Sequence, residues 1–216
     1  MSPRSAAGRR PVKPDYVALS FELLTALTVF AVVTLFTPGP NNIMLMASGL
    51  NFGARRTLPH AAGVVAGFGF MVFTVALGLG AVFAAYPLLY TVVKYVGAAY
   101  LLYLAWKIAN AGPAKGEATG TPLTFLQASA FQWVNAKAWV MAIGAVTAYA
   151  AVAPFPWNAL TFAIVFSLFG VASSATWVLF GTGLRRVVSD PKSVRIFNFV
   201  MAGLLVLSLV PVFLEL

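Results

Sequence analysis

Long apolar stretches, separated by short polar connectors, constrain the fold of this chain more than any other feature. Six such stretches lie at about residues 19–50, 60–83, 90–108, 123–150, 157–184 and 194–213. A transmembrane helix needs roughly 20 apolar residues, and the alternating ten-residue strands typical of a membrane barrel are absent from the sequence. The sequence therefore predicts an all-α integral membrane protein with six transmembrane helices.

The composition supports this prediction. The chain is 61% hydrophobic and only 9% charged, whereas a soluble domain carries about 25% charged residues. A net charge of +9 would suggest nucleic acid in a soluble protein, but here the charges lie in the connectors, so we expect no nucleic-acid partner. With no cysteine and one histidine, neither a metal site nor a cofactor is expected.

The distribution of basic residues predicts the orientation in the membrane. The connectors after the second and fourth stretches hold no charge, whereas those after the first, third and fifth hold Arg55, Arg56, Lys107, Lys115, Arg185, Arg186, Lys192 and Arg195. By the positive-inside rule the basic connectors face the cytoplasm, which places both termini outside. Basic residues near the N-terminus oppose this orientation, but three connectors outweigh one short tail.

The chain divides into a short leader and one domain. Residues 1–17 are basic and rich in proline, which predicts a disordered leader, and residues 18–216 form the membrane domain. The connector after the third stretch separates two halves of three helices each. Because three is an odd number, the second half enters the membrane inverted relative to the first, an arrangement typical of secondary transporters.

The first stretch is interrupted at residues 38–42. Pro38 and Pro40 break the helical hydrogen-bond ladder, and Gly39 between them relaxes the backbone. Asn41 and Asn42 add two carboxamides at the start of a second half-helix, whose N-terminus suits a carboxylate. The residues alone leave two interpretations open, because the break can be a transport site at membrane depth or a kink at the membrane edge.

Three motifs resemble the LysE/RhtB family of amino-acid exporters. TPGPNNIMLMASGLNFGARRTLPHAAGVVAGFGF is similar to the family's opening signature, through the PGPN break, the connector with Gly53 and Arg55, and the small residues Gly63 and Gly67. KYVGAAYLLYLAWK and FQWVNAKAW resemble its third and fourth helices. The exporters of cysteine and O-acetylserine look closest. The resemblance favours the transport-site interpretation, but Ala136 replaces a proline common in relatives, so a sharp break in the fourth helix is not supported.

Several polar residues within the apolar stretches are candidates for function. Lys137 lies in mid-stretch, where it can bind a carboxylate or a proton, snorkel to an interface, or neutralise helix C-terminal carbonyls. Gln132 and Asn135 can bind substrate or a neighbouring helix. Glu22 is a second proton-coupling candidate or a helix cap. His60 is expected at the membrane interface, where the second helix starts, with pH sensing as the alternative.

The leading hypothesis is an inner-membrane exporter of small amino acids or their derivatives, working by alternating access and driven by the proton gradient. The predicted substrate site consists of Pro38, Gly39, Pro40, Asn41, Asn42, Gln132, Asn135 and Lys137. The expected partners are the amino-acid substrate and membrane lipid, while the exported amino acid, the coupling ion and a homo-oligomeric state are left open.

Two alternatives belong to other classes. A channel or scaffold protein would use the same helices without alternating access. An intramembrane enzyme would need a nucleophile, for which Ser48 and His60 form a conceivable dyad. No acid stands near this histidine in the sequence to orient it, so the triad logic of serine enzymes fails.

Overall fold

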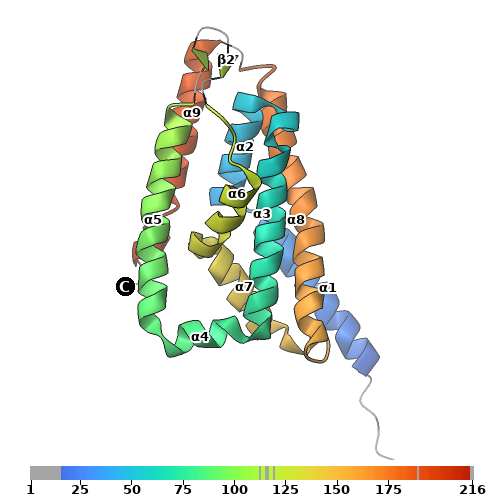
Figure 1. The fold of residues 1–216 in the computed structure, drawn as a ribbon. Coiled ribbons are helices and arrows are strands. Elements are labelled where there is room, and N and C mark those ends of the chain that lie inside the picture. Colours follow the sequence, from blue (N-terminus) through green and yellow to red (C-terminus); the bar gives the residue numbers. More distant parts are fainter. Residues whose placement is uncertain (1–15, 112, 115–116, 119, 189, 215–216) are drawn as a thin grey trace, which may run out of the picture.

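The computed structural model describes residues 16–111, 113–114, 117–118, 120–188 and 190–214. The predicted leader at residues 1–17 lies outside the described part, except for its last two residues. The described chain is helical apart from a short antiparallel hairpin of β1 (Pro113–Ala114) and β2 (Glu117–Ala118). Its helices (Figure 1) are α1 (Tyr16–Phe36), α2 (Pro40–Phe52), α3 (Ala54–Thr74), α4 (Gly80–Ala85), α5 (Pro87–Ala109), α6 (Phe125–Phe131), α7 (Ala136–Ala148), α8 (Trp157–Leu184), α9 (Pro191–Leu207) and α10 (Val210–Leu214).

Within the described residues, three helical segments are long and apolar enough to cross a membrane: Ala54–Val82, Thr91–Ala109 and Trp157–Leu184. A fourth is counted if Phe21–Phe36 and Pro40–Phe52, bent by 52° at their junction, form one broken span. The outer face of α8 carries large exposed apolar side chains, such as Leu168, Val171 and Leu179, which suits contact with lipid. The chain is therefore a multi-pass, all-helical membrane protein.

Glycines allow the closest contacts between helices. A Cβ on Gly181 of α8 would overlap the carbonyl oxygen of Met46 on α2. On α3, Gly63 and Gly67 leave no room for a side chain against the backbone of α6. Packing through small residues is typical of helix pairs in membranes, where no hydrophobic force between helices supplements van der Waals contact.

Two apolar cores stabilise the helix bundle. The first joins α2, α5, α6, α8 and α9 and contains large buried side chains such as Leu45 and Phe131. The second joins α1, α3, α7 and α8 around Met71, Phe162 and Phe166. Because α1 packs in one core and α2 in the other, the break between these helices lies where the two cores meet.

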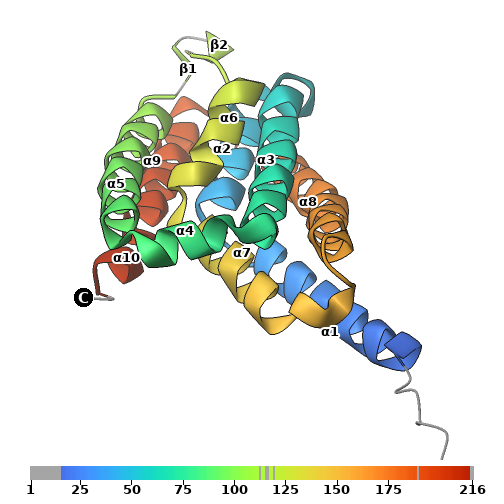
Figure 2. The same cartoon turned by 60° about the horizontal axis from the view of Figure 1, so that its bottom comes forward.

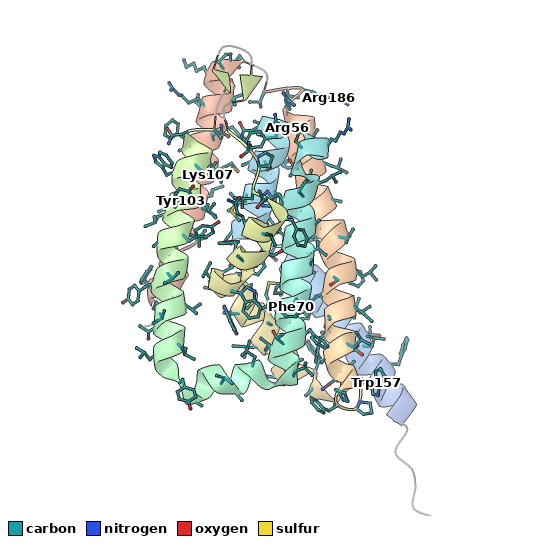
Figure 3. The ribbon with its side chains drawn as sticks, viewed as in Figure 1. Arg56, Phe70, Tyr103, Lys107, Trp157 and Arg186 are labelled. Carbon is teal, nitrogen blue, oxygen red and sulfur yellow. The ribbon has the colours of Figure 1, made fainter. Side chains whose placement is uncertain are left out.

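The basic connectors gather at one end of the bundle. The short connections from α2 to α3 and from α8 to α9 both lie at the end that carries the hairpin, and Figure 3 shows Arg56 and Arg186 there, with Lys107 a little below. Trp157 lies at the opposite end. At that end α4 runs across the bundle from α3 to α5 (Figure 2). A π-helical turn, Val75–Leu79, precedes α4 and contains Gly78 at a positive φ of 117°.

Candidate functional site

The candidate site is built around the break between α1 and α2. The break predicted at residues 38–42 lies at residues 37–39, so Pro40, Asn41 and Asn42 already form the first turn of α2. Proline fits there, because the first amides of a helix have no partner within it. Gly39 before it is fully extended. The break therefore frees carbonyl groups at the end of α1 and amide groups at the start of α2.

Side chains from three helices satisfy the freed carbonyls of α1. Asn42 donates from Nδ2 to the carbonyl oxygens of Leu35 (2.8 Å) and Thr37 (2.9 Å). Lys137 of α7 donates from Nζ to that of Thr37 at 2.7 Å, and the hydroxyl of Ser173 on α8 donates to that of Leu35 at 2.8 Å. A cation at this point complements the helix dipole. Lys137 also donates to the carbonyl of Pro38 at 3.5 Å, so one of the three N–H groups of its ammonium remains for a ligand.

Lys137 approaches the break closely because residue 39 is glycine. A Cβ on Gly39 would lie 2.7 Å from Cδ and 3.0 Å from Nζ of Lys137, closer than the roughly 3.5–4.0 Å at which carbon atoms pack. The glycine is not needed for its backbone angles, since its φ of −174° is extended and open to any residue. Its role here is to leave room for the lysine.

Two carboxamide side chains, one in the first apolar stretch and one in the fourth, bind each other through a pair of hydrogen bonds. Asn41 donates from Nδ2 to Oε1 of Gln132 at 2.8 Å, and Gln132 donates from Nε2 to Oδ1 of Asn41 at 3.1 Å. Gln132 is fully buried and also donates to the carbonyl of Ala128. This pair therefore connects two segments that lie 91 residues apart in the sequence.

The fourth segment is broken at Asn135, although the sequence did not support a sharp break there without the family's proline. A 3₁₀ turn, Gln132–Val134, follows α6, and Asn135 takes an extended conformation before α7 begins. The indole of Trp139 donates to the freed carbonyl of Trp133 at 2.9 Å. The break is thus stabilised by side-chain capping and does not require proline.

The two breaks face one pocket. Five of the eight predicted substrate-site residues line it: Gly39, Asn41, Asn42, Asn135 and Lys137. Gln132 contributes only through its bond to Asn41, and Pro38 and Pro40 flank the break. The apolar walls include Phe68, Met141 and Phe166.

One polar atom in this pocket is unused. Asn135 is 2% exposed, and its Oδ1 has no hydrogen-bond partner in the described part of the chain. A buried acceptor without a partner is costly unless a ligand or water satisfies it. The pocket therefore offers donors at the start of α2 and at Lys137, and an acceptor at Asn135.

The acidic residues lie elsewhere. Glu22 is exposed on α1, about 21 Å of helix before Phe36, and no acidic side chain of the described residues lines the pocket. Asp190 is exposed in the connector before α9, where hydrogen bonds from Ser193 hold the pKa of its carboxyl below the usual value. Of the two proton-coupling candidates, only Lys137 lies at the site.

The serine–histidine dyad considered from the sequence is not formed. The hydroxyl of Ser48 lies 3.0 Å from that of Thr57 and is hydrogen-bonded to it. His60 lies near the start of α3 and is buried between helices, because the single residue Gly53 connects α2 to α3 and brings their ends together. Neither ring nitrogen of His60 has a partner among the described residues.

The sequence did not single out the serines of α8. Ser173 and Ser174 line the pocket, and Ser173 binds the end of α1. The signal that could have found them is two adjacent hydroxyls in the middle of a long apolar helix. The buried pair of Asn51 and Asn198, which exchange hydrogen bonds of 2.7 and 3.0 Å, was also missed.

A bundle of apolar helices with two facing breaks around a pocket that carries a few polar groups is typical of a membrane transport protein. The sequence model of the LysE type translocator family matches residues 32–214. The chain belongs to this family, and it is a translocator, not an enzyme.

The chain is also similar to curated efflux proteins. It is 30% identical to a cysteine/O-acetylserine efflux protein of Klebsiella pneumoniae subsp. pneumoniae, over 89% of this chain and 98% of the relative. It is 31% identical to the protein of that name in Salmonella typhimurium, over 88% and 97% of the two chains. The identity to the Escherichia coli (strain K12) protein of that name is 30%, over 88% and 97%. No solved structure matches the chain.

Proposed function

We propose that this protein exports small amino acids or their polar derivatives, such as cysteine and O-acetylserine, across the bacterial inner membrane. The observation that carries the proposal is the meeting of two broken helices, where Asn41 and Gln132 bind each other beside a pocket that Lys137 and Asn135 line. The efflux activity named for the relatives supports the substrate class.

The pocket suits a zwitterion. The carboxylate of an amino acid would accept hydrogen bonds from the free amides at the start of α2 and from Lys137, where the helix dipole adds a partial positive charge. The ammonium would donate to the unpaired Oδ1 of Asn135, on the segment that faces the break. This recognises the backbone of an amino acid and leaves the side chain to the apolar walls formed by Phe68, Met141 and Phe166.

In this proposal the protein has six spans in two inverted halves, because the helices of the first half correspond in order to those of the second. Each half opens with a broken helix, α1–α2 or α6–α7, and the segment after each break, α2 or α7, has 13 residues. One long helix and one further helix follow in each half, α3 and α5 in the first, α8 and α9 in the second. Rocking of the two halves about the shared pocket would give alternating access.

Lys137 is the proposed proton-coupling residue, because it lies at the site and Glu22 does not. A proton gained or lost at its amine would change both the capping of α1 and the charge that faces the substrate carboxylate. Membrane lipid covers the exposed apolar faces in this proposal, and the arrangement needs no cofactor.

Counterflow in proteoliposomes tests the proposal. Vesicles that contain the purified protein are loaded with unlabelled O-acetyl-L-serine and diluted into a trace of the radiolabelled compound. A carrier accumulates label transiently, because exchange is faster than net flux, whereas a simple pore only equilibrates it. Asn41→Ala and Asn42→Ala should abolish the accumulation at normal protein levels. Equilibration without overshoot would identify a channel, and no movement of O-acetylserine, cysteine or other amino acids would refute the proposal.

A further inference from the structure

A second pocket lies along α2 and α3, nearer to the basic end of the bundle. It is lined by the later residues of α2 (Met44, Ala47, Ser48, Asn51 and Phe52), by His60 of α3, by Lys107 of α5, and by the connector that follows the hairpin. We call it the His60 pocket. Asn42 in the first pocket and Asn51 in this one are nine residues apart on one helix, about 14 Å along its axis. The two pockets therefore lie at successive levels of the same helices.

Most polar groups of the His60 pocket already bind one another. Ser48 is bonded to Thr57, and Asn51 exchanges hydrogen bonds with Asn198 and donates to the carbonyl of Ala47. Asn198 also donates to the carbonyl of Ala111. These groups form a fixed polar wall and offer few free donors or acceptors to a ligand.

His60 is the exception. It is 2% exposed, and neither Nδ1 nor Nε2 has a hydrogen-bond partner in the described part of the chain. A buried imidazole with both nitrogens unpaired loses the hydrogen bonds that water would supply, which is costly unless a ligand restores them. In a neutral ring one nitrogen donates and the other accepts, so a ligand that fits must offer both an acceptor and a donor.

Lys107 adds a positive charge to the same pocket. Its side chain is half-buried. Outside residues 112–119, whose side chains the structure does not describe, no acidic residue lines the pocket. The charge is therefore available for an anionic group on the ligand, and a carboxylate bonded to an ammonium is among the stronger polar contacts in proteins.

We propose that the His60 pocket is a second binding site for a zwitterionic amino acid, which is occupied from the basic end before the substrate reaches the pocket between the breaks. The carboxylate would bind Lys107, and the imidazole of His60 would exchange hydrogen bonds with the ammonium and with an oxygen of the ligand. The identity of the ligand rests on the proposed function, whereas the existence of the site rests on His60 and Lys107.

Transport kinetics measured from each face test this proposal. Inside-out vesicles present the basic end to radiolabelled O-acetyl-L-serine, if that end is cytoplasmic as the charges predict. His60→Leu, which keeps the bulk and removes both nitrogens, and Lys107→Met should raise the half-saturating concentration from this face about tenfold. The maximal rate from this face should stay near that of the natural protein.

Two further variants control for indirect effects. Lys94→Met removes the other lysine of α5, which lies over the ring of Phe213 and outside the His60 pocket, and should leave the kinetics unchanged from both faces. His60→Gln retains a donor and an acceptor and should recover part of the affinity lost in His60→Leu. All rates are normalised to the amount of protein in the membrane.

The outcomes separate this proposal from the proposed function. If the natural protein transports O-acetylserine and both His60→Leu and Lys107→Met match it from both faces, the second site is refuted and the proposed function stands. If the natural protein transports nothing, equilibrium dialysis of the purified chain with radiolabelled O-acetylserine decides. Binding that falls in His60→Leu supports the site, whereas binding that is absent or unaffected overturns it.

Discussion

Four carboxamides near the breaks differ in what remains free for a ligand. Asn41 and Gln132 bind each other, and Asn42 caps the end of α1 through two hydrogen bonds. Asn135 alone keeps a buried acceptor without a partner. The first three side chains therefore shape the pocket and hold the breaks in place, whereas Asn135 is equipped to contact the ligand directly.

Gly39→Ala should reduce export by displacing Lys137. The new methyl group would overlap the lysine side chain, and that side chain is flexible enough to move without unfolding the protein. We expect the initial rate in inside-out vesicles to fall about tenfold or more, and we expect the same of Lys137→Met, which removes the amine itself. When Gly39→Ala is combined with Lys137→Met, the alanine should reduce the rate little further, because no lysine is left to displace. If the double variant instead showed the product of the two single losses, this explanation would be contradicted.

Asn135→Ala should weaken recognition of the ammonium group. Without Oδ1 the pocket loses its free acceptor, so we expect the half-saturating concentration of O-acetyl-L-serine to rise about tenfold. The matched control is the analogue of O-acetylserine that lacks the amino group. Because this analogue has no ammonium for Asn135 to bind, the natural protein and Asn135→Ala should transport it equally. Equal losses for the two compounds would show that Asn135 acts through the shape of the break instead.

At the scale of whole helices, the close packing of α8 against α2 depends on a glycine in α8. Gly181→Ala places a Cβ against the carbonyl of Met46, whereas Gly183→Ala, on the same helix, meets nothing within 4 Å. Overpacking costs about 1–3 kcal/mol, so the melting temperature in detergent should fall by several degrees for Gly181→Ala. Gly183→Ala should be neutral or slightly stabilising, because alanine favours helix. Equal melting temperatures would mean that the helices separate easily.

Sequence reasoning predicted elements better than it predicted contacts. The prolines identified the first break to within a few residues, because their missing amides act locally. The break at Asn135 was not supported, since it is held by tertiary contacts such as the bond of Trp139 to the carbonyl of Trp133. The burial of His60 depends in the same way on how closely α3 follows α2. Partners far apart in the chain leave no local pattern to detect.

For the whole molecule, the number of spans depends on α9, which has 17 residues and is not among the helices long and apolar enough to cross a membrane, and on the segment of α6 and α7. Neither helix, at 7 and 13 residues, is long enough to cross the membrane alone. Together they lead from the end of the bundle that carries the hairpin to the end that carries Trp157 (Figure 3), which fits the one broken span of the six-span proposal. The alternative is a re-entrant loop, which would return to the side from which it came. The two arrangements give opposite orientations to everything that follows α7.

Labelling of single cysteines distinguishes the two arrangements, and the natural chain contains no cysteine to interfere. Suitable positions are Tyr86, Phe155 and Val187, which lie in connectors and are 62%, 68% and 81% exposed. In spheroplasts treated with a membrane-impermeant maleimide, six spans predict that Tyr86→Cys and Phe155→Cys react, while Val187→Cys reacts only after permeabilisation. A re-entrant α6–α7 segment would place Val187 on the side of Tyr86 and Phe155 on the other. That result would also end the inverted-repeat explanation, because the second half would no longer mirror the first across the membrane.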